Sequence, residues 1–284
     1  MSDSSAGDIL DANASPLLRD RGEAGPSVEK VHPDLSGVKA IYFDLDDTLC
    51  GYWDASKQAL RRAFELHGPQ GITPEEMVGH WASAFRRFAP TLKETGWYET
   101  YLKTAEPTRT EQMRLTLAEA GVIDEARALA LSETYMRERD ANLRLFSDAL
   151  LVLDTLKWRY PLGLITNGPA DLQRQEIATL GIESYFQNIY IEGEMGVGKP
   201  KRTVFDRAAA AVDCKPEELL MVGNSFGHDV APALEYGWHA VWIRRASDIP
   251  PSSTRSEEMP PGANAPDAII QHLSELLEIP GLAV

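Results

Sequence analysis

Two aspartates separated by one residue follow an apolar run near the start of the sequence. The run VKAIYF leads into Asp44 and Asp46, with Asp47 and Thr48 next. In an extended segment, side chains two residues apart point the same way, so these two carboxylates would repel each other. Either one of them is protonated or a cation lies between them. Mg2+, a hard ion that prefers oxygen ligands, would satisfy the pair and would also neutralise an incoming phosphate.

Three further polar sets follow apolar runs later in the chain. Thr166 and Asn167 follow the second run, Lys199 lies in the loop after the third, and Asn224 and Asp229 follow the fourth. Each set alone is common in turns and on protein surfaces. Four such endings in succession indicate one site, in which a lysine, a hydroxyl group and carboxylates would form a phosphoryl-transfer centre with a carboxylate nucleophile.

The elements that must position these residues alternate between strands and helices. Strands are predicted at 38–43, 161–168, 188–194, 218–224 and 239–245, and helices at 147–158, 171–181, 203–212 and 230–237. A short strand and a helix are predicted within 267–278. This alternation predicts an α/β fold with a Rossmann-like three-layer core around a parallel sheet. Chemistry in such sheets gathers at the carboxyl ends of the strands, where the polar sets fall.

A long helical stretch interrupts this pattern between the first strand and residue 145. Thr73, Pro74 and Glu76 have the spacing of a helix N-terminus, with the threonine as the cap. Trp81, Phe85 and Phe88 then fall on one helical face, which predicts packing between the inserted helices. The insertion is therefore predicted to be all-helical.

Composition narrows the class of partner and the compartment. The net charge of -15 argues against nucleic acid and anionic membranes as partners, because both would be repelled. Cys50 and Cys214 lie far apart with no zinc-finger spacing, which favours free thiols in a reducing compartment. No apolar run approaches the ~20 residues that a bilayer requires. We expect a cytoplasmic protein with a mobile leader over residues 1–36, and no feature indicates an oligomeric state.

The polar sets resemble the motifs of the haloacid dehalogenase superfamily of phosphohydrolases. The four matching segments are DLDDT, TNG, GKP and GNSFGHD, in that order, within about residues 39–237. The helical insertion is similar to the family's first class of cap domain. The resemblance implies a core formed by residues 37–52 and 146–284, and a cap formed by residues 53–145.

The resemblance also implies a role for each residue of the motifs. Asp44 would be the nucleophile, and Asp46 would act as general acid and then general base. Thr166 and the backbone N–H of Asn167 would bind phosphoryl oxygens, and Lys199 would balance the negative charge.

The resemblance implies a magnesium site as well. Mg2+ would be held by Asp44, by the backbone carbonyl of Asp46, and by Asn224 and Asp229 of the fourth motif. The chain departs from the family at two positions, because Lys201 and Asn224 stand where the family usually has acids. Lys201 is an alternative to Lys199 as the charge-balancing lysine, and Asn224 is expected to weaken binding of the metal.

The function implied is hydrolysis of a small phosphorylated metabolite through an aspartyl-phosphate. Phosphomutase or phosphotransferase activity on the same core, or a non-catalytic descendant that binds a phospholigand, are alternatives. Dehalogenation fits poorly, because that branch of the family lacks the second aspartate. Aromatic residues are candidates either for the cleft wall or for packing in the cap: Tyr52, Trp53, Trp97, Tyr98 and Tyr101.

Overall fold

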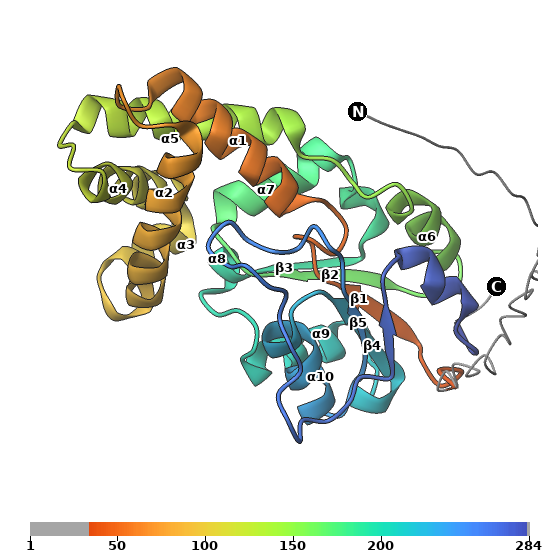
Figure 1. Cartoon of the computed structure of the whole chain (residues 1–284). Helices are drawn as coiled ribbons and strands as arrows, with labels where there is room; N and C mark the ends of the chain where they lie inside the picture. The colour runs from red at the N-terminus through yellow and green to blue at the C-terminus, as the bar shows by residue number, and fades with distance from the viewer. Residues whose placement is uncertain (1–33, 283–284) are drawn as a thin grey trace, which may run out of the picture. The chain divides into compact units, whose positions relative to one another are not determined.

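A parallel sheet forms the centre of the protein (Figure 1). The computed structural model describes residues 34–282. The sheet has six strands in the order β3-β2-β1-β4-β5-β6, and every neighbouring pair is parallel. The strands are β1 (Ala40–Phe43), β2 (Leu162–Thr166), β3 (Asn188–Ile191), β4 (Leu219–Gly223), β5 (His239–Ile243) and β6 (Ala268–Ile270). The predicted parallel α/β fold is confirmed.

Side chains of the central strand alternate between two hydrophobic clusters. Ile41 and Phe43 face one cluster and Ala40 and Tyr42 face the other, as the two-residue period of a strand requires. Helices cover both faces, with α6 and α7 against the first cluster and α9 and α10 against the second (Figure 1). Their bounds are α6 (Ala149–Leu156), α7 (Ala170–Leu180), α9 (Arg202–Ala211) and α10 (Ala231–Glu235).

The stretch between β1 and α6 is helical, as predicted. Its elements are α1 (Tyr52–His67), α2 (Pro74–Phe88), the 3-10 helix η1 (Ala89–Glu94), α3 (Trp97–Lys103), α4 (Glu106–Glu119) and α5 (Glu125–Asn142). Thr73 caps α2 by accepting a hydrogen bond from the Glu76 N–H, and the Glu76 side chain bonds back to Thr73. The helices share a hydrophobic cluster of their own, which includes Leu60, Trp81 and Leu131.

Two predicted segments have a different secondary structure in the protein. The strand predicted to run to residue 194 stops at Ile191 and gives way to the helical turn α8 (Glu192–Met195). The helix predicted after β6 is the 3-10 helix η5 (Leu273–Glu278). Two more 3-10 helices are η2 (Glu183–Tyr185) and η3 (Pro216–Glu218), and residues Phe226–Val230 form a π-helical turn, η4.

The domain boundaries remain a proposal. The described residues belong to one compact unit, so the division at residues 53–145 rests on the helical content and the separate hydrophobic cluster of that stretch. Most of the predicted leader, residues 1–33, lies outside the described residues. Leu35, at its end, is fully buried and its N–H donates to the Pro280 carbonyl. Among the described residues, no helix has both the length and the hydropathy to cross a bilayer.

Candidate active site

Asp44 stands directly after β1, at the carboxyl edge of the central strand. Its N–H donates to the Val222 carbonyl of β4, which continues the sheet pairing and fixes the backbone. Its side chain is buried, with Oδ1 accepting from Lys199 Nζ at 2.6 Å and Oδ2 accepting from the Thr48 hydroxyl at 3.0 Å. Burial raises the pKa of Asp44 to about 6, while the charge of Lys199 opposes that rise.

Lys199 links the first motif to the fourth. Its ammonium group also forms an ion pair with Asp229 Oδ1 at 2.6 Å, and both side chains are almost fully buried. Burial alone would lower the pKa of Lys199, but the carboxylates of Asp229 and Asp44 raise it, so the lysine is charged. Lys201, the alternative lysine, is exposed and is the N-cap residue directly before α9. The structure therefore brings Lys199, and not Lys201, to Asp44.

Gly223 is the last residue of β4 and the first of the fourth motif, and there is no room for a side chain at this position. A Cβ atom on Gly223 would lie 2.3 Å from Asp229 Oδ2. The Asp229 carboxylate packs against this bare backbone and accepts a hydrogen bond from the Ser225 N–H at 2.9 Å. A larger residue at position 223 would displace the carboxylate that faces Lys199.

Asp46 contacts α7 rather than Lys199. Its Oδ2 accepts a hydrogen bond from Gln173 Nε2 at 3.1 Å. Burial raises the pKa of Asp46 to about 6, and the neighbouring charge of Asp44 raises it further in the same direction. A carboxyl group with a pKa in this range can give and take a proton near neutral pH.

Asp47 has a structural role that the sequence pattern does not reveal. It is buried, its φ angle is 58°, and its Oδ1 accepts a hydrogen bond from the Trp53 N–H at 3.1 Å. This bond satisfies an N–H in the first turn of α1, where the helix itself supplies no acceptor. Burial raises the pKa of Asp47 to about 8. The residue therefore joins the first motif to the start of the helical insertion.

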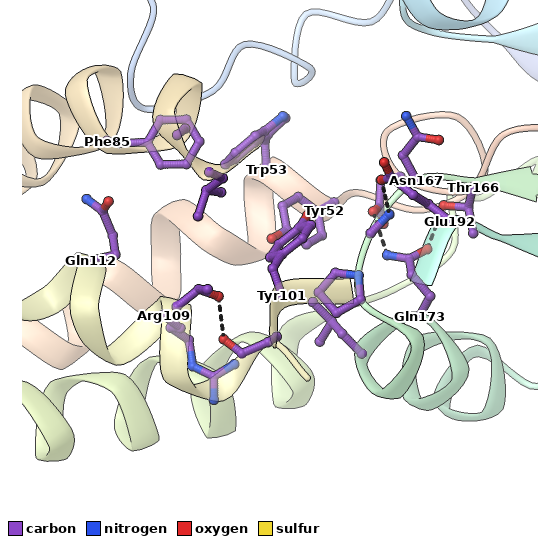
Figure 2. A pocket seen from close by; sticks show the side chains of 18 of the residues that line it. Tyr52, Trp53, Phe85, Tyr101, Arg109, Gln112, Thr166, Asn167, Gln173 and Glu192 are labelled. Atoms are coloured by element: carbon purple, nitrogen blue, oxygen red, sulfur yellow. Dashed lines mark hydrogen bonds between the residues drawn. The ribbon is translucent and has the colours of Figure 1, made fainter. Parts of the chain in front are cut away.

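Thr166 ends β2 and Asn167 follows it, but the side chains of both residues contact protein groups. The Thr166 hydroxyl donates to Gln173 Oε1 at 2.6 Å (Figure 2). The Asn167 side chain accepts from the Lys199 N–H and donates to the Lys199 carbonyl, each at 2.8 Å. The amide of Asn167 thus fixes the loop that carries the lysine.

The fourth motif is held by a residue far along the chain. The carboxylate of Glu257 accepts hydrogen bonds from the Phe226 N–H at 2.8 Å, from the Gly227 N–H at 2.9 Å and from the Ser225 hydroxyl at 3.1 Å. The Asn224 backbone carbonyl accepts from Trp242 Nε1 at 2.8 Å. These contacts fix the backbone at Asn224 and directly after it, and the Asn224 side chain lines the cavity described next.

A cavity of about 720 Å³ connects these groups with the inserted helices. Figure 2 shows Thr166 and Asn167 at one side of it, Phe85 at the other, and the Trp53 ring between them. Tyr52, Trp53, Tyr98 and Tyr101 line the cavity, whereas Trp97 does not and instead packs edge-on against Phe88. The phenylalanine and tryptophan side chains of α2, expected only to pack, line the cavity as well: Trp81, Phe85 and Phe88.

Glu192 is a buried carboxylate in this cavity wall. It follows β3 directly and accepts hydrogen bonds from the Tyr98 hydroxyl at 2.6 Å and from the Gly168 N–H at 3.2 Å. The sequence pattern missed it because the predicted strand ran through position 192. A strand ending at Ile191 would have placed this acid at the carboxyl edge with the others.

The residues around Asp44 fit a magnesium ion by the chemistry of their donors. Asp44, Asp229, the Asn224 side chain and the Asp46 backbone carbonyl offer only oxygen donors, which Mg2+ prefers. Within residues 34–282, no group of three or more His, Cys, Asp or Glu side chains is assembled for a metal ion. The fit therefore depends on neutral oxygens, from the protein or from water, beside the carboxylates.

The comparison with known families decides the assignment. The model of the haloacid dehalogenase-like hydrolase family matches residues 41–243. The chain belongs to the haloacid dehalogenase-like hydrolases. This confirms the family that the four motifs predict and the prediction that the chain is an enzyme of the hydrolase class.

Relatives of this hydrolase include named phosphatases. A phosphoserine phosphatase from Thermus thermophilus is 33% identical over 226 residues, which is 73% of this chain and 89% of the relative. A glyceraldehyde 3-phosphate phosphatase from Methanothermobacter thermautotrophicus is 29% identical over 247 residues, 85% of this chain and 99% of the relative. Among solved structures, the HAD-hydrolase YfnB from Bacillus subtilis bound to magnesium has a TM-score of 0.65 and 21% identity, covering 86% of this chain and 98% of that one. At that identity the likeness shows the fold alone.

Proposed function

We propose that this hydrolase is a Mg2+-dependent phosphatase that cleaves a small phosphate monoester through an aspartyl-phosphate on Asp44. The observation that carries the proposal is the position of Lys199, whose ammonium group lies 2.6 Å from a carboxylate oxygen of both Asp44 and Asp229. A buried cation between two carboxylates at a sheet edge is suited to receive the charge of a phosphate. The names of the two phosphatase relatives support the same reaction.

The chain's own residues have distinct roles in the proposed reaction. Asp44 attacks phosphorus, and a bond to its carboxylate oxygen forms as the phosphorus bond to the ester oxygen breaks. The Asp46 carboxyl group gives its proton to the leaving oxygen. Asp46 then takes a proton from the water that attacks the aspartyl-phosphate, which releases inorganic phosphate and restores Asp44.

The remaining groups bind the phosphate and the metal. Lys199 and the backbone N–H of Asn167 would balance and bind the phosphoryl oxygens. For Thr166 to bind there too, its hydroxyl would have to leave Gln173 Oε1. Asp44, the Asp46 carbonyl, Asn224 and Asp229 would hold Mg2+. When bound, the ion would neutralise charge on the phosphoryl group.

The substrate is proposed to be a small phosphorylated metabolite. Phosphoserine and glyceraldehyde 3-phosphate are the first compounds to test, because relatives are named for them. Nucleic acid and membranes are not proposed as partners, since the net charge is -15. We also propose a cytoplasmic location, because Cys50 and Cys214 are free thiols.

The test is release of inorganic phosphate from phosphoserine, glyceraldehyde 3-phosphate and 4-nitrophenyl phosphate, with Mg2+ and with EDTA. Asp44→Asn is expected to lower kcat on the order of 10^4-fold, as loss of a nucleophile does. The matched control is Asp54→Asn, since Asp54 is exposed on α1 and does not line the cavity. Equal activity of Asp44→Asn and wild type would disprove the role of Asp44 as the nucleophile.

The same assay separates the two alternative functions. Appearance of a new phosphate ester with added glycerol would indicate phosphotransfer, and tight binding of the phosphate esters without turnover would indicate a non-catalytic descendant.

A further inference from the structure

Gln173 connects the polar residues at the ends of β1 and β2, because its amide contacts both Asp46 and Thr166. It lies on the first turns of α7, seven residues after Thr166, and only 1% of its surface is exposed. Its Oε1 accepts from the Thr166 hydroxyl at 2.6 Å (Figure 2), and its Nε2 donates to Asp46 Oδ2 at 3.1 Å. A single buried amide therefore contacts both the residue proposed as acid and base and a residue proposed for the phosphate.

The orientation of this amide is determined by its neighbours. Nε2 also donates to Glu176 Oε2 at 2.8 Å, so both of its hydrogens face carboxylate oxygens. Rotating the amide by 180° would place Oε1 against these two oxygens, and that arrangement would need a proton on the facing oxygen of both carboxyl groups. The observed orientation satisfies all three contacts while the facing carboxyl oxygens are unprotonated, and it points a donor at Asp46.

A buried ion pair supports Gln173 from the other side. Glu176 Oε1 lies 3.1 Å from Arg139 Nη2, and each of these side chains is 1% exposed. Arg139 belongs to α5 of the helical insertion, whereas Glu176 belongs to α7 beside the sheet. The Arg139 guanidinium also lies over the Tyr52 ring, 5.5 Å from its centroid. Because unpaired charges are costly when buried, the pair holds Glu176 in place against Gln173.

We propose that Gln173 is a positioning residue that holds the Asp46 carboxyl group toward the leaving oxygen, and that the Arg139–Glu176 pair holds Gln173. The inference rests on the proposed function, because it takes Asp46 as the general acid. Gln173 touches neither substrate nor phosphorus in this role. Its amide fixes the rotation of one carboxyl group, and with it the path of the proton from that group to the ester oxygen as the phosphorus–oxygen bond breaks.

This role predicts a dependence on the leaving group that a packing role does not. A 4-nitrophenolate ion leaves without being protonated, whereas a benzyl alkoxide needs a proton from the enzyme. The two phosphate esters have similar aromatic groups and differ chiefly in this need. A misplaced Asp46 should therefore slow benzyl phosphate more than 4-nitrophenyl phosphate, while general loss of packing should slow both alike.

The experiment measures kcat/KM for both esters with the full chain and Mg2+, because kcat/KM reports the steps up to cleavage of the ester. Gln173→Met keeps the length of the side chain without its amide. It is expected to lower kcat/KM for benzyl phosphate about tenfold more than for 4-nitrophenyl phosphate. Asp46→Asn should show a larger difference in the same direction, about 100-fold, as loss of a general acid does. Gln173→Asn, which is too short to reach both partners, is measured as a second variant, and thermal unfolding checks that each variant is folded.

The matched control is Gln175→Met on the same helix. Gln175 is exposed and donates to Asp140 Oδ2 of α5 at 2.6 Å, so its loss also removes a contact between α7 and the insertion. Its ratio of the two kcat/KM values should stay within twofold of wild type. If both Gln173 variants slow the two esters equally while Asp46→Asn discriminates between them, the positioning role is wrong and the proposed function stands. If Asp46→Asn does not discriminate, the acid role fails, and the inference fails with it.

Discussion

The carboxyl edge of the sheet and the helical wall of the cavity use different interactions. At the sheet edge, charged groups contact one another directly, as Lys199 does with Asp44 and Asp229 at 2.6 Å each. The helical wall contains many aromatic side chains, and some of these rings contact each other, as Trp81 and Phe85 do with centroids 4.9 Å apart. Ion pairs fix atoms in place, whereas aromatic surfaces accept many shapes of ligand. We infer that the sheet edge carries the chemistry and that the helices select the substrate.

The largest effect that would test this contrast is expected from Lys199→Met. The change leaves Asp44 and Asp229 buried without their shared cation and removes the charge proposed to bind the phosphate. We expect kcat to fall by about 10^2- to 10^3-fold, the range for loss of one electrostatic group. The measurement is phosphate release from 4-nitrophenyl phosphate. Lys201→Met is the control, because Lys201 is exposed and lies outside the cavity. A larger fall in kcat for Lys201→Met than for Lys199→Met would mean that Lys201 is the charge-balancing lysine.

An intermediate effect is expected in the helical wall, from Tyr101→Ala. Tyr101 lines the cavity and stacks on Tyr98, with centroids 6.4 Å apart. Removing the ring should raise KM for an aryl phosphate about tenfold through lost contact area, with kcat within threefold of wild type. Steady-state kinetics would show the split between KM and kcat. Trp97→Ala on the same helix is the control, since Trp97 does not line the cavity. A fall in kcat with unchanged KM would contradict the inference that the helices select the substrate and the sheet edge carries the chemistry.

A smaller effect is expected from Asn224→Asp. The change adds a carboxylate where the chain offers a neutral amide beside Asp229, so the metal should bind more tightly. We expect the Mg2+ concentration for half-maximal activity to fall about fivefold, equivalent to roughly 1 kcal/mol. Calorimetric titration of Mg2+ gives a second readout that is independent of turnover. An unchanged or increased midpoint would mean that Asn224 does not contact the metal.

The smallest effect is expected from Glu257→Gln. This change removes the negative charge from the group that accepts hydrogen bonds from the Phe226 and Gly227 N–H groups. The turn between Asn224 and Asp229 should loosen, and the Mg2+ midpoint should rise about twofold, the scale of charge effects at a helical N-terminus. Titration of Mg2+ against activity is the measurement. Glu258→Gln serves as the control because Glu258 is the next residue and is exposed. An equal shift in both variants would show that only net charge matters.

The parallel sheet and the placement of Asp44 could be predicted from the sequence because both follow from local patterns, whereas the choice of Lys199 over Lys201 came from the resemblance to the family's third motif. An apolar run predicts a strand, and parallel strands bring their carboxyl ends together. Gln173 could not be found in this way. Its role depends on which face of α7 packs beneath Thr166 and Asp46, which is a property of the folded chain. The role of Glu257 is still harder to predict from the sequence, because this residue contacts the fourth motif from a loop of Pro, Ser and Gly residues with no periodic pattern.

Glu192 was harder to predict than Asp44 but easier than Gln173 or Glu257. It follows a strand end as the predicted residues do, but continuing the strand to residue 194 concealed it. The predicted strand was too long at its C-terminal end, because Glu192, the polar residue that follows the apolar run, was counted as part of the strand. Its hydrogen bond from Tyr98 ties the sheet edge to the inserted helices.

The central claim is that Asp44 forms a covalent bond to phosphorus, and trapping that intermediate tests it most directly. In the Asp46→Asn variant, the first step should still proceed, because the 4-nitrophenolate ion leaves without being protonated. The second step, hydrolysis of the aspartyl-phosphate, should be slow because the variant lacks the general base. We predict a rapid burst of about one nitrophenol per chain, and mass spectrometry after acid quenching should find a phosphoryl group on the peptide that contains Asp44. Release of nitrophenol without a burst and without a phosphorylated peptide, or a phosphoryl group on another residue, would contradict the account.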